Sequence, residues 1–344
     1  MVQRFKHSVI GFGRIGKRHA KIINEYEPTE LVSVVDTDSN QFLNIDELGL
    51  NAIQYNSINE FLKSDQNKSE IVTIATPNFF HAPYAVQLLE AGYDVLIEKP
   101  MGLSEGECNN VIETEKKTGK RVFVVKQNRY SPPSVWMKEM IEKKTIGDTL
   151  MVQVNCYWNR DDRYYKTNNN WKGDKKLDGG ALFTQFSHFV DIMYWVFGDI
   201  KNPRAIVKNF THPDLKDFDD SGFAQFEFEK GGIGSINYST SCWDKNMESS
   251  ITVVGTKGSF KVGGQYMNEV EYCHIKEYEM PELPATNPPN DYGPYKGSAA
   301  NHHYVFENIV DVLNGKIPPT ATSFDGMKVV SIIERIYKAA GFIN

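Results

Sequence analysis

The feature that most constrains the fold is the glycine-rich stretch Gly11-Phe12-Gly13-Arg14-Ile15-Gly16, which follows an apolar run and opens a helical pattern. In a G-x-G-x-x-G stretch the first glycine permits a tight turn, the second lets the backbone approach a pyrophosphate, and the third lets the helix pack closely on the strand. The phosphates then lie at the helix N-terminus, where free N–H groups and the helix dipole favour negative charge. The stretch predicts a strand–turn–helix unit that binds a dinucleotide, although such a hexapeptide also occurs in ordinary turns.

A carboxylate follows at the spacing that a dinucleotide site needs. The second expected strand, Glu30–Asp36, ends at Asp36, 20 residues beyond Gly16. A carboxylate there accepts hydrogen bonds from the ribose hydroxyls of NAD and repels the 2′-phosphate of NADP. We therefore expect NAD as the cofactor, with NADP as the second choice because neighbouring residues can override a single Asp.

The order of the expected elements indicates two domains. In the first third of the chain, short apolar runs alternate with helical patterns, which is typical of a doubly wound parallel sheet of the Rossmann type. After Tyr130, long β-type runs are separated by glycine turns and predict a mainly antiparallel, open-faced sheet with flanking helices, one of them over about Gly180–Val196. We expect a dinucleotide-binding domain over residues 1–128 and a substrate-binding and oligomerisation domain over residues 129–344, an α/β unit followed by an α+β unit.

Composition excludes several classes of protein. A formal net charge of −6 argues against a general binder of nucleic acid or acidic membranes. The four cysteines show no CxxC spacing and no paired Cys/His pattern, so neither a disulfide framework nor a metal site is expected. The first ten residues lack the apolar core of a signal peptide, and no run of about 20 apolar residues predicts a membrane span. A cytoplasmic protein is the expectation.

Two strand ends carry candidate site residues. Thr76-Pro77-Asn78 follows the expected strand Ile71–Ala75, at the carboxyl edge where such sheets bind ligands, and the same residues also suit a plain helix-initiating turn. Glu98 and Lys99 close the next strand. Pro100 disfavours the α conformation for Lys99 and keeps it extended. Lys99 beside a nicotinamide could accept the proton of a substrate hydroxyl, whereas the alternative is an ordinary surface lysine.

A third candidate lies on the expected helix after Gly179-Gly180. In one continuous helix Thr184 and His188 are i and i+4 and share a face. Histidine can carry a proton near neutral pH, and the threonine hydroxyl can orient it or bind a substrate. The alternative is a buried histidine in a polar niche. Asp191 either orients His188 or completes a separate network.

Taken together, these stretches resemble the glucose–fructose oxidoreductase / inositol dehydrogenase (Gfo/Idh/MocA) family over nearly the whole chain. The stretches that carry the resemblance are Gly11–Gly16, Asp36, Thr76-Pro77-Asn78, Glu98-Lys99-Pro100, Gln127-Asn128-Arg129-Tyr130, Asp178-Gly179-Gly180 and His188. The family implies reversible hydride transfer from a ring carbinol to NAD(P), with Lys99 and His188 handling the proton. Many members have Asp at the position of Thr184, and this departure makes Lys99 the expected base.

Further stretches are similar to one subgroup of the family: Trp158-Asn159-Arg160, Tyr164-Tyr165, Trp171-Lys172-Gly173, residues 178–198 and residues 292–315. That subgroup is the UDP-N-acetylglucosaminuronate 3-dehydrogenases of lipopolysaccharide O-antigen synthesis. That subgroup implies oxidation of the 3-hydroxyl of a nucleotide-linked uronate by tightly bound NAD, with 2-oxoglutarate as a candidate acceptor that regenerates it. The resemblance also implies further cofactor contacts from His81, Glu98, Lys99, Gln127, Trp171 and Lys172. It implies substrate contacts from Lys99, Asn128, Arg160, Arg163, Tyr165, Thr184, Gln185, His188 and Tyr295.

Several alternatives stay open at the level of sequence. Arg160 and Arg163 either bind a carboxylate or diphosphate, since arginine binds both bidentately, or are solvated loop residues. Tyr292, Tyr295 and His302 either line the sugar-nucleotide side or form an arm between subunits of a homodimer or homotetramer. A free sugar or inositol dehydrogenase is the second enzyme hypothesis. A dinucleotide-sensing binding protein is the non-enzyme hypothesis, and it would not need Lys99 and His188.

Overall fold

The computed structural model describes residues 4–64, 68–166, 171–215, 217–293 and 295–343, and it contains two compact units. The first comprises Met1–Lys126 and His302–Met327, and the second comprises Gln127–Asn301 and Lys328–Asn344. The expected boundary after residue 128 lies close to the observed change at Lys126. The structure differs from the expected division in one segment, 302–327, which folds with the N-terminal unit.

Packing of an aromatic side chain explains that difference. The helix α9 (His302–Leu313) carries Phe306, which is completely buried. Its ring lies 5.9 Å from the ring of His7 and 5.5 Å from that of His19, both of which belong to the N-terminal unit. Contacts between segments so far apart in the chain have no local signal in the sequence.

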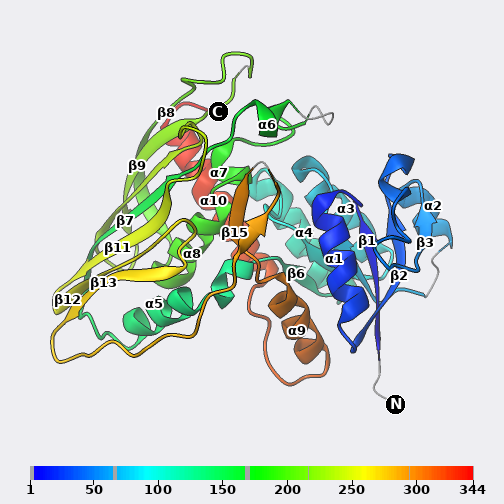
Figure 1. Cartoon of the computed structure of the whole chain (residues 1–344), viewed down its shortest axis with the longest axis horizontal. Helices are drawn as coiled ribbons and strands as arrows, with labels where there is room; N and C mark the ends of the chain where they lie inside the picture. Colours follow the sequence, from blue (N-terminus) through cyan, green and yellow to red (C-terminus); the bar gives the residue numbers. More distant parts are fainter. Residues whose placement is uncertain (1–3, 65–67, 167–170, 216, 294, 344) are drawn as a thin grey trace. The chain divides into compact units, whose positions relative to one another are not determined.

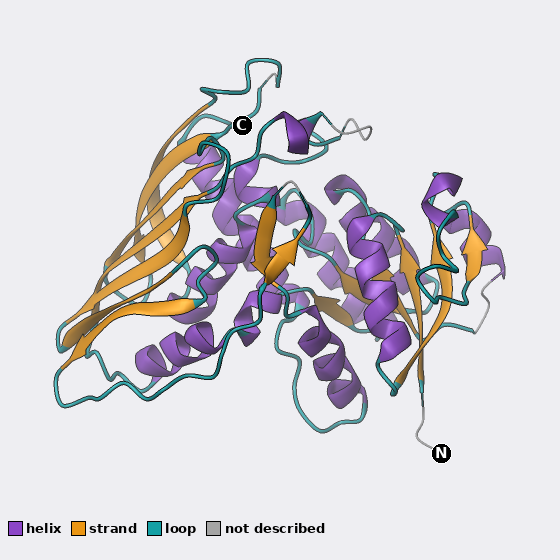
Figure 2. Cartoon of the chain, viewed as in Figure 1, coloured by secondary structure: helices purple, strands orange, loops and turns teal. Residues whose placement is uncertain are grey.

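The N-terminal unit is a parallel six-stranded sheet in the order β3-β2-β1-β4-β5-β6, with helices on its faces (Figures 1 and 2). Strands such as β4 are buried at every residue, as parallel strands covered on both faces require. The strands are β1 (Phe5–Ile10), β2 (Thr29–Val35), β3 (Ile53–Tyr55), β4 (Ile71–Ile74), β5 (Asp94–Ile97) and β6 (Val122–Val124). The helices are α1 (Arg14–Glu25), η1 (Ser39–Phe42), α2 (Ile58–Ser64), η2 (Asn78–Phe80), α3 (His81–Glu90) and α4 (Glu105–Thr118).

The second unit contains a seven-stranded sheet in the order β13-β12-β11-β7-β10-β9-β8. All its neighbouring strands are antiparallel except the pair β7 and β10. The expected fold class, a doubly wound parallel sheet followed by a mainly antiparallel sheet, is therefore confirmed. The strands are β7 (Thr149–Tyr157), β8 (Ile200–Lys208), β9 (Ser221–Phe228), β10 (Ile233–Ser239), β11 (Glu248–Gly255), β12 (Gly258–Gly263) and β13 (Glu269–Ile275). A separate hairpin pairs β14 (Pro289–Asp291) with β15 (Lys296–Ala299).

Only one face of the larger sheet is covered. Along β9 the residues alternate between buried and exposed, and the buried side chains include Phe226 and Phe228. In Figure 2 the helices α5 and α8 lie on the covered side of the curved sheet. The helices of this unit are η3 (Gln127–Tyr130), α5 (Pro132–Glu142), α6 (Asp162–Tyr165), α7 (Ala181–Thr184) and α8 (Ser187–Phe197). The last helix, α10 (Ser323–Ala339), begins in the N-terminal unit and ends in the second.

Two kinds of feature are absent from the described residues. No helix there is long and apolar enough to cross a membrane. No group of three or more His, Cys, Asp or Glu side chains in the same residues is arranged to hold a metal ion.

Candidate active site

The turn after β1 is shaped by close backbone contacts that only glycine allows. Gly11 has φ +89°, and a Cβ atom there would lie 2.6 Å from the carbonyl group of Ala75. A Cβ atom on Gly16 would lie 1.8 Å from the oxygen of Gly11, so α1 approaches the turn only with glycine at this position. A Cβ atom on Gly13, by contrast, would meet no described atom within 4 Å. The turn therefore leaves space in front of Gly13, as a bound pyrophosphate requires.

Helix α1 begins with backbone donors that an anion can use. Its N-cap, Gly13, has no side chain, and its first turn contains no acidic residue. The first N–H groups of a helix lack partners within the helix, and the dipole makes this end positive. Arg14 is exposed and Ile15 is half-buried at this end. The start of α1 therefore fits the phosphates of a dinucleotide.

Asp36 connects the end of β2 to the glycine turn. Its Oδ2 accepts the Phe12 N–H at 2.7 Å, and its Oδ1 accepts the Asp38 N–H at 2.9 Å. Each carboxylate oxygen can accept more than one hydrogen bond, so the half-buried Asp36 can also receive ribose hydroxyls. The two backbone bonds fix the direction of the carboxylate beside the turn.

Lys99 follows β5 and precedes Pro100, to which it is joined by a cis peptide bond. The neighbouring Glu98 is buried, and its Oε2 accepts the Lys99 backbone N–H at 3.0 Å. The other oxygen, Oε1, lies 2.8 Å from Nε2 of His19 on α1. Burial alone would raise the pKa of Glu98, but the hydrogen bond from His19 and the positive charges nearby hold that pKa well below its usual value. Glu98 is therefore a carboxylate whose two oxygens bind groups of the chain.

His81, the first residue of α3, contacts two loops at once. Its Nδ1 lies 2.6 Å from the oxygen of Pro100, and its Nε2 lies 2.8 Å from the oxygen of Thr76. Burial lowers the pKa of His81, and the bonds to the two carbonyls oppose that shift. A neutral imidazole has one N–H and donates to one of these carbonyls, whereas the protonated ring donates to both.

The residues expected at the cofactor in the N-terminal unit fall into two groups, according to whether their polar atoms already bind other groups of the described chain. The polar atoms of Glu98 and His81 bind groups of the chain. The Thr76 hydroxyl has no hydrogen-bond partner among the described residues, and Pro77 and the buried Asn78 lead from it into η2. A buried polar atom without a partner marks a place where a ligand or water completes the hydrogen bonding.

In the second unit, the prediction of one continuous helix over about Gly180–Val196 is wrong. The segment forms α7 and α8, which are separated at residues 185–186. The Phe186 N–H bonds to the oxygen of Ala181 at 3.1 Å, one residue further back than an α-helix would require. Thr184 therefore ends one helix, and His188 lies in the first turn of the next. The two residues therefore do not share a face of one continuous helix, which their i, i+4 spacing predicts.

Partners from distant parts of the chain stabilise this interruption. Asp219 Oδ1 accepts the Ala181 N–H at 2.9 Å, and the hydroxyl oxygen of Tyr337 accepts the Leu182 N–H at 2.9 Å. The Tyr337 hydroxyl in turn donates to Asp219 Oδ2 at 2.9 Å. Gly180, with φ +118°, is required here because a Cβ atom would lie 2.6 Å from that hydroxyl. These bonds satisfy the first N–H groups of α7, which makes so short a helix stable.

A carboxylate that the sequence reasoning did not place in the site lies beside Thr184. The Thr184 hydroxyl donates to the fully buried Asp178, whose Oδ2 also accepts the Gly173 N–H at 2.7 Å. The signal in the sequence is that Asp178 opens the Asp178-Gly179-Gly180 stretch, which carries part of the family resemblance and lies six residues before Thr184. The neutral residue at position 184 is therefore in contact with a negative charge supplied from elsewhere.

The segment η3 contributes a buried amide. Arg129 binds Asp191 through two hydrogen bonds, of 3.0 Å from Nε and 2.7 Å from a terminal nitrogen, and both side chains are 1% exposed. This pair joins η3 to α8. Asn128 is buried, and neither its oxygen nor its nitrogen has a partner among the described residues. Gln127 donates to Ser298 at 3.3 Å. Asn128 is thus equipped to donate to and accept from a ligand.

Arg160 is a buried cation surrounded by neutral acceptors. Its guanidinium donates to Gln185 Oε1 at 3.0 Å, to Asn246 Oδ1 at 3.2 Å, and to the backbone oxygens of Asn159 and Lys296 at 2.5 and 3.1 Å. No Asp or Glu of the described residues forms an ion pair with it. Burial lowers the pKa of Arg160, but a guanidinium stays charged in proteins. Its positive charge is therefore not balanced by a carboxylate of the described chain.

Aromatic rings enclose the same guanidinium. Its carbon lies 4.7 Å from the ring centre of Trp158, 4.8 Å from that of Tyr295 and 5.5 Å from that of Tyr164. The rings of Tyr164 and Tyr295 meet edge to face at 5.3 Å. The face of each ring attracts a cation, so the rings favour the buried charge without neutralising it. We refer to Arg160 and these three rings as the arginine cage.

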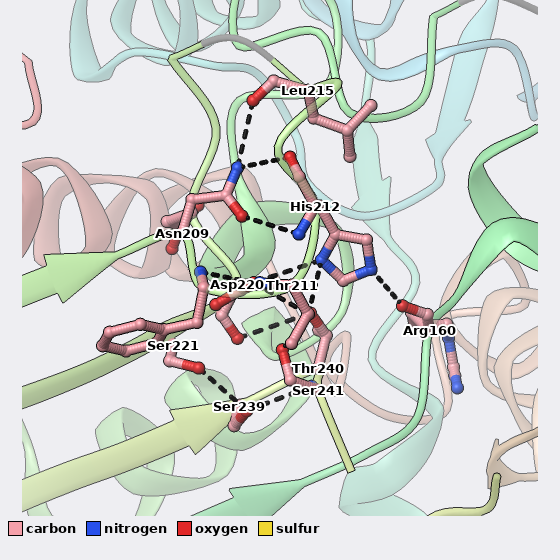
Figure 3. Close-up of polar contacts among 12 residues, drawn as sticks. Arg160, Asn209, Thr211, His212, Leu215, Asp220, Ser221, Ser239, Thr240 and Ser241 are labelled. Atoms are coloured by element: carbon pink, nitrogen blue, oxygen red, sulfur yellow. Dashed lines mark hydrogen bonds and ion pairs between the residues drawn. The ribbon is translucent and has the colours of Figure 1, made fainter. Parts of the chain in front are cut away.

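A hydrogen-bond network fixes the backbone of Arg160 (Figure 3). The Arg160 N–H donates to the oxygen of Thr240 at 2.7 Å, and its own oxygen lies 2.7 Å from His212 Nε2. His212 Nδ1 lies 3.2 Å from Asp220 Oδ2, which also accepts the Thr211 N–H at 2.7 Å. Burial alone would raise the pKa of Asp220, but these donors hold it well below its usual value. The network therefore rigidly positions the arginine cage.

The two candidate arginines differ in their surroundings. Arg163 is partly exposed and forms ion pairs with Asp161 at 2.7 Å and with Asp244 at 3.4 Å. Two carboxylates compensate its charge, as is common at a protein surface. Arg160 is buried without such a partner in the described chain, so the geometry favours Arg160 over Arg163 as the residue that binds an anion.

The other expected site residues of the second unit lie near the arginine cage. Lys172 Nζ lies 4.2 Å from the ring centre of Tyr164, and Trp171 is half-buried beside it in the chain. Tyr165 is buried, with its ring against Phe218. Gln185 and Tyr295 contact Arg160 directly.

Two family models match the chain. Residues 5–126 match the NAD-binding Rossmann fold of an oxidoreductase family named GFO_IDH_MocA, and residues 135–261 match the GFO/IDH/MocA C-terminal domain.

Solved structures and a curated relative agree with that match. The WlbA dehydrogenase of Bordetella pertussis, determined with NADH and UDP-GlcNAcA, has a TM-score of 0.87 and 28% identity, covering 98% of this chain and 97% of its own. The WlbA dehydrogenase of Chromobacterium violaceum, with the same ligands, has a TM-score of 0.87 and 26% identity, covering 98% and 94%. Inositol 2-dehydrogenase of Salmonella typhimurium is 29% identical over 197 residues, 56% of this chain. The match spans 55% of the length of that relative.

Proposed function

Because this chain belongs to the GFO/IDH/MocA oxidoreductase family, we propose that it oxidises a ring hydroxyl, at C3, of a nucleotide-linked sugar acid such as UDP-N-acetylglucosaminuronate. The N-terminal unit is an NAD-binding Rossmann domain. Support for the substrate comes from the two WlbA dehydrogenases, whose structures contain NADH and UDP-GlcNAcA and resemble this chain over nearly its whole length.

One observation carries the choice of an anionic substrate, namely that no carboxylate of the described residues balances the buried charge of Arg160. A buried cation without a counter-ion is costly, and the cost falls when an anion binds beside it. The sugar carboxylate or the diphosphate of such a substrate would supply that anion, and a guanidinium can bind either one bidentately. The ion pairs of Arg163 leave it at the surface, so it contributes at most a second, weaker attraction.

The proton and the hydride leave the substrate by different routes. NAD, when bound, accepts the hydride from the carbinol carbon. The hydroxyl proton passes to Lys99 or to His188, so that the C–H and O–H bonds break, the C=O bond of a ketone forms, and NADH and one proton are the other products. Thr184 donates its own hydrogen to Asp178, so toward a substrate hydroxyl its oxygen acts as an acceptor. The Asn128 amide can bind a neighbouring hydroxyl.

A second candidate function is oxidation of an uncharged cyclitol or free sugar, which the inositol 2-dehydrogenase relative favours. The two functions differ in the charge of the substrate. An uncharged cyclitol would leave Arg160 without a counter-ion, and for that reason we rank it second.

Oligomerisation belongs to the same proposal. The uncovered face of the larger sheet exposes apolar side chains on neighbouring strands: Ile206 is 65% exposed and pairs with Phe223 at 62%, and Ile233 at 55% pairs with Met151 at 47%. Clusters of this kind mark protein interfaces. We propose that two copies of the chain pair through this face, as a homodimer or as half of a homotetramer.

Purified protein tests the proposed function directly. Addition of UDP-N-acetylglucosaminuronic acid to the enzyme with NAD should raise the near-ultraviolet absorbance of NADH, and 2-oxoglutarate should then lower it if it regenerates the cofactor. Turnover of myo-inositol or glucose, with none of the nucleotide sugar acid, would contradict the proposal. Lys99→Ala should bind NAD but lose turnover, and retained turnover would remove Lys99 from the chemistry.

A further inference from the structure

The dipeptide Lys99-Pro100 is held from both sides by buried side chains. The backbone N–H of Lys99 donates to Glu98 Oε2 at 3.0 Å, and the backbone oxygen of Pro100 lies 2.6 Å from Nδ1 of His81. Lys99 itself is half-buried, whereas Glu98 and His81 are 7% and 1% exposed. The backbone of this dipeptide is therefore fixed at both ends, at the Lys99 nitrogen and at the Pro100 oxygen.

Each of these side chains also reaches a second segment that belongs to the cofactor site. Glu98 Oε1 lies 2.8 Å from Nε2 of His19, which is buried on α1, the helix that begins at the glycine turn. His81 Nε2 lies 2.8 Å from the backbone oxygen of Thr76, a residue whose hydroxyl has no hydrogen-bond partner among the described residues. Through single side chains, the lysine backbone is thus connected to both segments that would hold the dinucleotide.

We propose that Glu98 and His81 are positioning residues that clamp Lys99 relative to the bound cofactor, and that neither binds the cofactor through its polar side-chain atoms. The inference rests on the proposed role of Lys99 as a proton-handling group. Because the reacting groups must align within a fraction of an ångström, a displaced lysine lowers the rate even where both reactants still bind. Glu98 and His81 act through Lys99, so they affect turnover only while the lysine is present.

Glu98→Gln and His81→Gln test the clamp separately. An amide in place of the Glu98 carboxylate keeps one acceptor but loses the other. An amide in place of the His81 ring reaches only one of the two carbonyls that Nδ1 and Nε2 contact from different sides of the ring. We expect kcat to fall by about 10- to 100-fold in each variant while the dissociation constant of NAD changes by less than about 3-fold. Glu60→Gln is the matched control, since Glu60 accepts the Asn56 N–H at 2.9 Å on the surface of α2 and should leave kcat unchanged.

A double-mutant cycle decides whether Glu98 acts through Lys99. In the Lys99→Ala background, with turnover restored by added methylamine, Glu98→Gln should change the rescued rate by less than about 2-fold because a free amine is not held by the clamp. An equal loss in both backgrounds would overturn the proposal, as would a kcat close to that of the unaltered enzyme. A loss of NAD affinity in step with kcat would also overturn it, because it would make Glu98 or His81 a cofactor ligand.

Other variants and a crystal structure test the same clamp if one variant fails to fold. If Glu98→Gln does not fold, His81→Gln and His19→Gln probe the same clamp, and a crystal structure of either with NAD should show the Lys99 backbone displaced. An unchanged backbone in that structure would refute the clamp. Failure of the proposed function itself is distinguishable, since the unaltered enzyme would then not turn over the nucleotide sugar acid. Retained turnover in Lys99→Ala without any amine would instead remove only the proton-handling role of Lys99, on which the clamp rests.

Discussion

The guanidinium of Arg160 donates from Nε to Gln185 Oε1 at 3.0 Å, and Gln185 lies at the interruption between α7 and α8. The residue that would attract the anion of the substrate is thus bonded to the segment that carries Thr184 and His188. Arg160, which would bind the anion, and the start of α8, which carries His188, are therefore joined through one hydrogen bond to Gln185.

This arrangement predicts a large effect of Arg160 on substrate affinity. Arg160→Met removes the buried cation of the cage, and we expect the KM for the nucleotide sugar acid to rise by about 100-fold, since an anion loses a buried charged partner. Arg160→Lys should be intermediate because it keeps the charge but loses the planar fork. Steady-state kinetics at saturating NAD measures both.

The control for this experiment is Arg163→Met, which removes a surface cation already paired with Asp161 and Asp244. Its KM should change by less than about 3-fold, because exposed ion pairs contribute little. An equal rise of KM in the Arg160 and Arg163 variants would show that general electrostatic attraction, and not the arginine cage, selects the substrate.

The contact between Thr184 and Asp178 predicts that an acidic residue cannot replace Thr184 as a single substitution. Thr184→Asp would place two buried carboxylates in contact, and both cannot ionise. We expect a loss of about 1–3 kcal/mol in the free energy of unfolding at neutral pH. The folded protein would retain a proton that the unfolded chain releases, so the loss should grow as pH rises above the ordinary carboxyl range.

The double variant Asp178→Asn/Thr184→Asp tests this explanation. With one charge removed, thermal unfolding should return toward the melting temperature of the unaltered protein. If the double variant is as unstable as Thr184→Asp alone, repulsion between the two carboxylates is not the cause.

Local signals made the fold and the glycine turn before α1 predictable. The glycine spacing and Asp36 lie within one strand–helix–strand unit, and their geometry follows from that unit. The interruption after α7 has no such signal, because it depends on Asp219 and Tyr337, whose bonding partners are 38 and 155 residues away. In the same way, the sequence places Glu98 at a strand end but does not indicate that it turns toward His19, 79 residues away.

The glycine turn predicts opposite outcomes for two similar substitutions. Gly13→Ala adds a methyl group that meets no described atom, so the protein should fold and lose at most about 1 kcal/mol of stability, because alanine is a poorer N-cap than glycine. The methyl group would occupy the space where the backbone approaches the pyrophosphate, and we expect the dissociation constant of NAD to rise by about 10-fold. Fluorescence titration with NADH measures that affinity.

Gly11→Ala should behave differently, because its methyl group would lie 2.6 Å from the Ala75 backbone at a φ of +89°. We expect it to destabilise the fold by about 1–3 kcal/mol, as strained non-glycine residues do. If Gly13→Ala lowers stability while leaving NAD affinity intact, the space in front of Gly13 is not the phosphate site.

The buried histidine His7 predicts the response of the N-terminal unit to acid. His7 is fully buried on β1, neither of its ring nitrogens has a partner among the described residues, and burial lowers its pKa from 6.5 to about 3. Between these values the unfolded chain binds a proton that the folded protein does not, so stability falls as pH falls, by up to about 1.4 kcal/mol per pH unit for this residue. His7→Phe should reduce that slope, as measured by urea unfolding at several values between pH 4 and pH 6.5. His303→Phe, on the half-buried side of α9, is the control and should leave the slope unchanged. Equal slopes in the His7 variant and the unaltered protein would show that His7 does not contribute to the acid sensitivity of the fold, which burial of His302 also favours.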